Sequence, residues 1–183
     1  AAGAAAAVLS TVANYAQMAV VIEATDHRTF LATILPVGAA GLAALLSGGW
    51  LTLAAWRAVT AEPPRMSRSF NLLMALTFAA TVAIMLMSAA ALRAWFGDAG
   101  LIAVAAIGGV LDVHAAVISL AAQVADGTMA APQAILPILT ACTTSTLAKI
   151  FFSATVGTRA FAARVIPAQL LIIGAAWLTV FVG

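Results

Sequence analysis

Two ionisable side chains, Asp112 and Lys149, lie deep within long apolar stretches of the sequence. An ionised group at the middle of a bilayer costs about 2.5–3.5 kcal/mol on insertion scales, so such residues usually serve an ion, a proton or a substrate. At helical spacing Asp112 shares one face with small and polar residues: Gly108, Ala116, Ser119 and Gln123. Two interpretations stay open: a ligand-binding carboxylate, or a protonated or paired carboxyl that only joins helices.

A second polar stripe surrounds Lys149. Its members are Cys142, Ser145, Lys149 and Ser153, with Thr140, Thr143, Thr144 and Thr146 beside them. Counted from the loop near Asp126, Thr144 is about as deep as Asp112, and Lys149 lies about 8 Å further. Lys149 either bends back toward Asp112 or extends to the far membrane interface. The candidate residues of an ion-binding or substrate-binding site are therefore Asp112, His114, Ser119, Thr144, Ser145 and Lys149.

The sequence gives weaker support to two other functions, metal binding and nucleophilic catalysis. Asp112 and His114 lie about 200° apart on a helix, so they would hold one metal ion only if the helix opened at Gly108-Gly109, and a packed histidine is the alternative. Ser145 and Lys149 have the spacing of a Ser-Lys nucleophile pair, but no recognisable oxyanion-hole loop accompanies them. We predict neither an enzyme nor a bound cofactor.

The composition restricts the class of protein that positions these residues. Of the 183 residues 64% are hydrophobic and 8% are charged, with a net charge of +2 and a mean hydropathy of +1.13. A soluble domain carries roughly a quarter charged residues, and no Lys/Arg cluster suits nucleic acid. The lone Cys142 forms no internal disulfide. The sequence predicts an integral membrane protein.

Six apolar runs are long enough to span a bilayer as helices, which takes about 20 residues each. They cover about 2–24, 29–57, 69–95, 99–124, 132–156 and 160–182. The connections are short and carry nearly all the charge, so residues 1–183 are expected to form a single all-α transmembrane domain. With six spans the arginines divide almost evenly between the two sides, which leaves the orientation undecided.

An internal repeat is predicted with an offset of 131 residues. Arg28, Phe30, Ala32 and Pro36 match Arg159, Phe161, Ala163 and Pro167, and a hydroxyl-rich helix precedes each copy. The first copy is about 1–58, the linking helix 69–95, and the second copy with its preceding helix 99–183. If no helix is re-entrant, the two copies point the same way. Nothing before the first copy matches 99–124, so we expect the natural chain to continue upstream of Ala1.

Three motifs carry a resemblance to a known family. They are Gly109-x-x-Asp112-x-His114-Ala115, Thr144-Ser145-Thr146-Leu147-x-Lys149 and Gly157-x-Arg159. The chain resembles the bacterial membrane family of unknown function that is often fused behind an MgtC/SapB domain. His114 stands where that family usually has an acid, and Ser145 where it usually has Asn. The resemblance implies a bacterial inner-membrane helical bundle with internal symmetry and no settled activity.

Two function hypotheses follow. The first is a permease-like or ion-binding membrane protein whose mid-membrane site joins the six candidate residues, with the lipid bilayer, an ion or small solute and a homo-oligomer as its expected partners. The second is a structural or regulatory membrane subunit in which the same polar groups only hold helices together.

Overall fold

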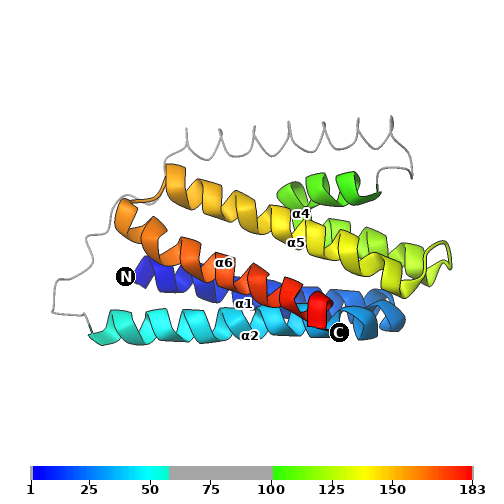
Figure 1. The fold of residues 1–183 in the computed structure, drawn as a ribbon, viewed down its shortest axis with the longest axis horizontal. Coiled ribbons are helices and arrows are strands. Elements are labelled where there is room, and N and C mark those ends of the chain that lie inside the picture. Colours follow the sequence, from blue (N-terminus) through cyan, green and yellow to red (C-terminus); the bar gives the residue numbers. More distant parts are fainter. Residues whose placement is uncertain (1, 58–100, 183) are drawn as a thin grey trace.

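The computed structural model describes residues 2–57 and 101–182, and this part of the chain is helical throughout apart from short turns (Figure 1). The helices are α1 (Ala2–Thr25), α2 (His27–Arg57), α4 (Leu101–Ala125), α5 (Ala131–Thr155) and α6 (Arg159–Val182). The all-α prediction is confirmed, and the ends of these helices lie within a few residues of the predicted ones. The predicted span 69–95 lies outside the described residues.

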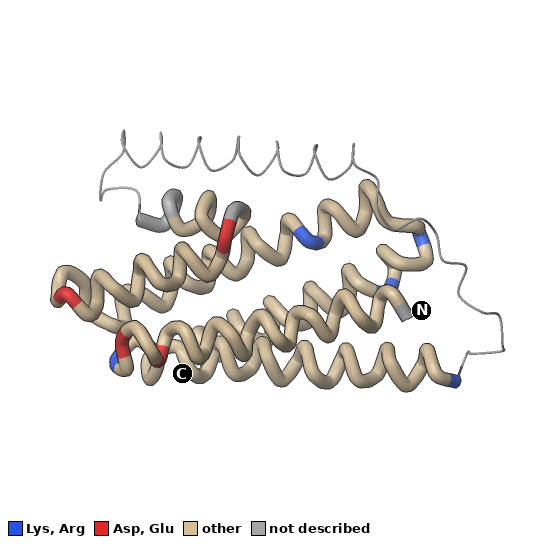
Figure 2. The backbone as a smooth tube through the Cα atoms, turned by 180° about the vertical axis from the view of Figure 1, so that it is seen from behind, with Lys and Arg blue, Asp and Glu red and all other residues tan. Residues whose placement is uncertain are grey.

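Four helices, α1, α2, α5 and α6, are long and apolar enough to cross a bilayer. Large apolar side chains cover the outside of the bundle, among them Leu35, Leu46, Trp50, Phe151 and Leu171. Most charged residues of the described chain gather toward the two ends of the bundle (Figure 2). An apolar belt between charged ends indicates a membrane-embedded protein. The six-span count itself stays a prediction.

Helix α4 folds back on itself at Asp112. This residue has extended backbone angles, φ −155° and ψ 101°, within an otherwise helical segment. A methyl group placed on Gly108 would lie 2.9 Å from Ala116 Cβ, whereas eight residues of straight helix span about 12 Å. Two arms, 101–111 and Asp112–Ala125, therefore form a helical hairpin, and Figure 1 shows the green first arm turned back beside the rest of α4. The break lies three residues beyond Gly108-Gly109, where the sequence suggested an opening.

The two helix pairs α1–α2 and α5–α6 run in opposite senses. Helix α2 begins at the end of the bundle where α4 meets α5, because Arg28 Nη2 donates to Val124 O over 2.8 Å. Helix α6 begins at the other end, near the N-terminus, after α5 has crossed the bundle (Figure 1). The sequence-based expectation of parallel copies required that no helix be re-entrant, and the α4 hairpin removes that condition.

A buried apolar core joins the pairs. It includes Val8 and Ile22 of α1, Val117 of the second α4 arm, Ile138 of α5 and Ile172 of α6, each at most 1% exposed. Small residues of α2, such as Ala40 and Ala44, are also fully buried and let the helices approach closely. Packing of this kind fixes the position of the polar groups between the helices.

Asp26 organises the turn between α1 and α2. Its Oδ2 accepts hydrogen bonds from the Thr29 backbone N–H (2.7 Å) and hydroxyl (2.8 Å), and its Oδ1 accepts one from Arg28 Nε (3.2 Å). Burial alone would raise the pKa of Asp26, but the hydrogen bonds from Thr29 and Arg28 outweigh it and lower that pKa. Asp26 thus satisfies a free N–H of α2 while Arg28 satisfies a free carbonyl of α4.

The α4 hairpin is testable by disulfide trapping in a Cys142→Ser background. We expect Gly108→Cys with Ala116→Cys to cross-link on mild oxidation, since the two arms bring these positions together. Ala168→Cys with Ala176→Cys in straight α6 has the same separation in sequence and should stay reduced. A mass shift on non-reducing peptide mapping gives the answer, and equal behaviour of the two pairs contradicts the hairpin.

Asp26→Ala should lower the apparent melting temperature at pH 7. Because the pKa of Asp26 is lower in the folded protein, its contribution is complete above the ordinary Asp value of 3.8 and disappears as the pH falls through the folded pKa. The difference between wild type and variant should therefore shrink on acidification. Asp126→Asn, at an exposed carboxylate of the α4–α5 loop, is the matched control.

Candidate functional site in the membrane interior

A small polar cavity lies where α1, the tip of the α4 hairpin and α5 meet. It is lined by Asn14, Tyr15 and Met18 of α1, Val113 of α4, and Cys142, Ser145, Thr146 and Lys149 of α5. Its volume is about 10 Å³, which is room for a single water-sized group. Lys149, the only lysine in the sequence, supplies the only charge among the lining residues.

Some of the polar groups around the cavity bond to one another. His114 Nε2 lies 3.1 Å from Asn14 Oδ1, so the ring N–H donates and the amide oxygen accepts. The Thr146 hydroxyl donates to Cys142 O over 2.8 Å, and the side chains of Tyr15 and Thr146 are hydrogen-bonded. Cys142 Sγ contacts Met18 Sδ at 3.7 Å. These contacts fix the walls of the cavity.

Three hydrogen-bond donors on the walls of this cavity remain without a partner in the described chain. The Lys149 ammonium, the Ser145 hydroxyl and the Asn14 amide N–H₂ have no hydrogen-bond or ion-pair partner within residues 2–57 and 101–182. All three side chains are half-buried, and an unpaired donor at membrane depth is costly because lipid offers it no partner. The cavity is therefore suited to a group that accepts hydrogen bonds.

The structure brings Ser145 and Lys149 together but places Asp112 elsewhere. Asp112 is exposed at the hairpin tip, and its Oδ1 accepts the His114 backbone N–H over 2.9 Å. This carboxylate caps the second arm of α4, whose first backbone N–H groups have no helical partner. It does not line the cavity that holds Lys149.

The other predicted residues lie around this site. The Thr144 hydroxyl bonds to carbonyls of its own helix, Thr140 O and Ala141 O, and faces the backbone of Gly109. Ser119 lies one turn before Gln123 on the second arm, and its carbonyl accepts Gln123 Nε2 over 3.3 Å. His114 reaches the site through Asn14, and its Nδ1 is buried without a partner in the described chain.

The predicted metal pair receives no support from further ligands. No group of three or more His, Cys, Asp or Glu side chains comes together within the described residues. Asp112 and His114 are linked through the His114 backbone N–H, and the ring itself is directed to Asn14. The arrangement favours a capped helix end over a two-ligand metal site.

Several polar residues that join helices were not among those predicted from the sequence. Gln169 of α6 is 1% exposed and donates to Thr11 Oγ1 of α1 over 3.1 Å. Trp177 Nε1 of α6 donates to Thr143 Oγ1 of α5 over 2.9 Å. Tyr15, which lines the polar cavity, was also not predicted. Two features of the sequence could have pointed to these residues: Tyr15 is the only tyrosine, and Gln169 is an amide in the middle of the last apolar run.

The cavity is lined by positions that the predicted repeat pairs with one another. Asn14 and Ser145, Tyr15 and Thr146, and Met18 and Lys149 are each 131 residues apart and all line the cavity. The first member of each pair lies on α1 and the second on α5, and these two helices run in opposite directions (Figure 1). The site therefore lies where the segments that the predicted repeat relates face each other.

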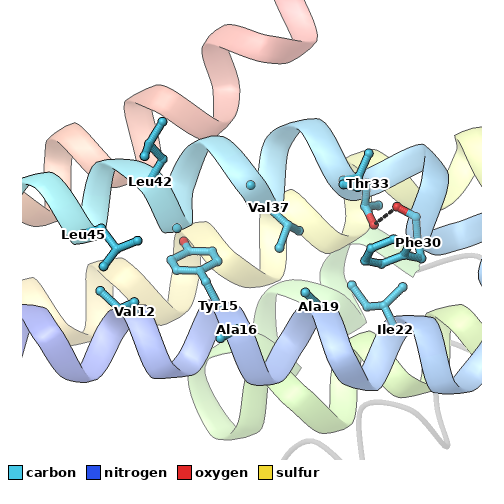
Figure 3. A pocket seen from close by; sticks show the side chains of 13 residues that line it. Val12, Tyr15, Ala16, Ala19, Ile22, Phe30, Thr33, Val37, Leu42 and Leu45 are labelled. Carbon is cyan, nitrogen blue, oxygen red and sulfur yellow. Dashed lines mark hydrogen bonds between the residues drawn. The ribbon is translucent and has the colours of Figure 1, made fainter.

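A larger cavity of about 340 Å³ lies beside the polar one, between α1 and α2 (Figure 3). Its walls are apolar and include Val12, Ala19, Phe30, Val37 and Leu42. The Thr33 hydroxyl in its wall is already bonded to Thr29 O. Tyr15 lines both cavities. The larger one offers nothing that would recognise a polar ligand.

The model of a protein family, the domain of unknown function DUF4010, matches residues 1–157. The chain belongs to this family. This confirms the expected membership of a family of unknown function, whereas fusion to an MgtC/SapB domain stays a prediction. The match covers α1, α2, α4 and α5, and therefore every element that lines the polar cavity. The comparison with curated proteins found no match, and the comparison with solved structures found none.

Gly109→Ala should destabilise the contact between the hairpin tip and α5. A methyl group on Gly109 would collide with Ala141 O and Thr144 Oγ1, and overpacking of this kind costs about 1–3 kcal/mol. Gly174→Ala in α6 meets no atom within 4 Å and should be neutral or slightly stabilising. Thermal unfolding can be followed by maleimide-dye labelling of Cys142, which is buried and the only cysteine. Equal melting temperatures for the two variants would contradict the close contact between Gly109 and α5.

Proposed function

We propose that the protein is a permease-like membrane protein that binds a small polar solute or ion in the cavity between α1, α4 and α5. The observation that carries this proposal is the tip of the α4 hairpin, an interrupted helix that lies beside Lys149, which has no hydrogen-bond or ion-pair partner among residues 2–57 and 101–182. In membranes, irregular backbone at this depth is tolerated only where protein buries it or where it lines a cavity.

The arrangement of the helix pairs supports the same proposal. If the predicted repeat is real, α1–α2 and α5–α6 are inverted copies, since they run in opposite senses. Secondary transporters built from inverted repeats bind substrate at the repeat interface, near the bilayer midplane and beside broken helices. Asn14 and Ser145, which face the cavity from equivalent positions, match that description.

The charged ends suggest an orientation for the bundle. Within the described residues, Arg57 ends α2 and Arg159 begins α6 at one end of the bundle, with Arg164 further along the start of α6, whereas Arg28 at the other end is paired with Asp26. By the positive-inside rule we assign the first end to the cytoplasm. The bacterial inner membrane is the proposed location. A reporter fused after Val182 would contradict this orientation if it were found in the cytoplasm.

A structural role is the second candidate, and specific contacts favour it. Gln169 with Thr11, Trp177 with Thr143, and His114 with Asn14 are hydrogen bonds between helices, and each such bond is worth about 0.6 kcal/mol in a membrane. These contacts explain why Thr11 and Thr143 are polar. They leave Lys149 and Ser145 unexplained, which is why we prefer a solute-binding role and also propose that the protein is not an enzyme.

Solute flux into reconstituted vesicles tests the proposal. Stopped-flow swelling in a panel of sodium salts and neutral polyols should reveal at least one permeant solute, and Lys149→Met should reduce its flux at least tenfold. Thr155→Ala, at an exposed hydroxyl on the same helix, should leave flux unchanged. If no tested solute enters and Lys149→Met only lowers the folded yield, the structural role is correct. Covalent labelling of Ser145 by a fluorophosphonate would instead indicate an enzyme.

A further inference from the structure

We infer that the polar cavity binds a single-atom anion such as chloride, held by Lys149, Ser145 and Asn14. This inference rests on the proposed function, because it names the class of ligand for the same site. Its basis is the balance of charge, donors, acceptors and space around the cavity.

Among the described residues that line the cavity, the charge is positive and no acid compensates it. Lys149 is the only charged side chain among the eight residues that line the cavity, and none of the eight is an Asp or a Glu. The nearest acid on the facing element, Asp112, is exposed and bonded to the His114 backbone N–H. Because an isolated ammonium in an apolar bundle is costly, a bound anion would remove most of that cost.

Among the described lining residues, the polar side chains without a hydrogen-bond partner can all donate. His114 Nε2–H occupies Asn14 Oδ1, which turns the amide N–H₂ of Asn14 to other partners. The Ser145 hydroxyl is free to donate, whereas the Thr146 hydroxyl is already used on Cys142 O. A cation would need oxygen ligands, and these walls offer few that are not already engaged. Asn14 of α1 and Ser145 and Lys149 of α5 can thus all donate to one acceptor placed between the two helices.

The space sets the size of the anion. A cavity of about 10 Å³ holds one water-sized group, so a single-atom anion enters with small adjustments of Lys149 and Met18. A tetrahedral oxyanion such as sulfate would require the helices to separate. The structure therefore predicts selectivity for chloride over sulfate.

The experiment measures thermal unfolding of the purified protein in detergent, followed by dye labelling of Cys142. Sodium chloride is titrated against sodium gluconate at constant ionic strength, and sodium sulfate is tested in the same way. We expect a saturable rise in melting temperature with chloride and no such rise with sulfate. Lys149→Met should weaken the apparent chloride affinity at least tenfold, Ser145→Ala should weaken it several-fold, and Thr155→Ala should not change it.

Two further measurements keep the outcomes distinct. Lys149→Arg retains the cation and should retain chloride-dependent stabilisation, which protects the test if Lys149→Met folds poorly. Chloride stabilisation that is equal in wild type and Ser145→Ala and Lys149→Met, or equal for chloride and sulfate, overturns the inference. If a cation or neutral solute permeates in a Lys149-dependent way and chloride has no effect, the anion site is wrong and the permease function stands. If chloride binds saturably but no solute permeates, the anion site stands and the permease function is wrong.

Discussion

The interior of a bilayer supplies no hydrogen-bond partners, and this constraint accounts for where most polar groups of the protein lie. Nearly every serine and threonine hydroxyl of the spanning helices donates to a carbonyl one turn earlier in its own helix, as Thr33, Thr140 and Ser153 do. A hydroxyl that is satisfied in this way makes no demand on its surroundings. A stretch rich in threonine is therefore a poor indicator of a site, and Ser145, whose hydroxyl has no such partner in the described chain, is the informative exception.

The same constraint explains the chemistry of the α4 break. Interrupting a helix frees backbone N–H groups that must be satisfied locally. Asp112 does this by accepting the His114 N–H, so the residue at the break supplies the cap for the arm that follows it. The closest approach to α5 is then made by Gly109, where any side chain would collide with Ala141 O. An acid that the sequence offered as a candidate ligand is thus used as the cap of the hairpin tip, and a glycine lets that tip approach α5.

The sequence predicted the helices well and the site in part. Hydropathy placed the ends of α1, α2, α5 and α6 correctly, because the length and apolar content of a span are local properties. The stripe that includes Cys142, Ser145 and Lys149 does face the bundle interior, since helical periodicity fixes which residues share a face. The partners of that stripe depend on packing between distant segments. Tyr15 and Gln169 could therefore not be assigned to their contacts with Thr146 and Thr11 from spacing alone.

Hydropathy alone does not distinguish a hairpin from a span, and for residues 101–125 this difference has the largest consequence. Residues 101–125 are apolar over a length that would cross the membrane, but each arm separately is about 16–21 Å long, which is too short for a hydrocarbon core of about 30 Å.

A hairpin returns the chain to the side from which it came. It therefore reverses the direction of everything that follows, so Arg28 and Arg159, which six spans would place on one side, lie at opposite ends. One extended residue at Asp112 therefore bears on whether the predicted repeat relates the two helix pairs as parallel or inverted copies. Because α1 and α5 run in opposite directions, Asn14 and Met18 line the same cavity as Ser145 and Lys149, so the two helices differ chemically where they meet. One helix contributes an amide and a thioether, the other a hydroxyl and a cation, and this asymmetry gives the cavity its positive character.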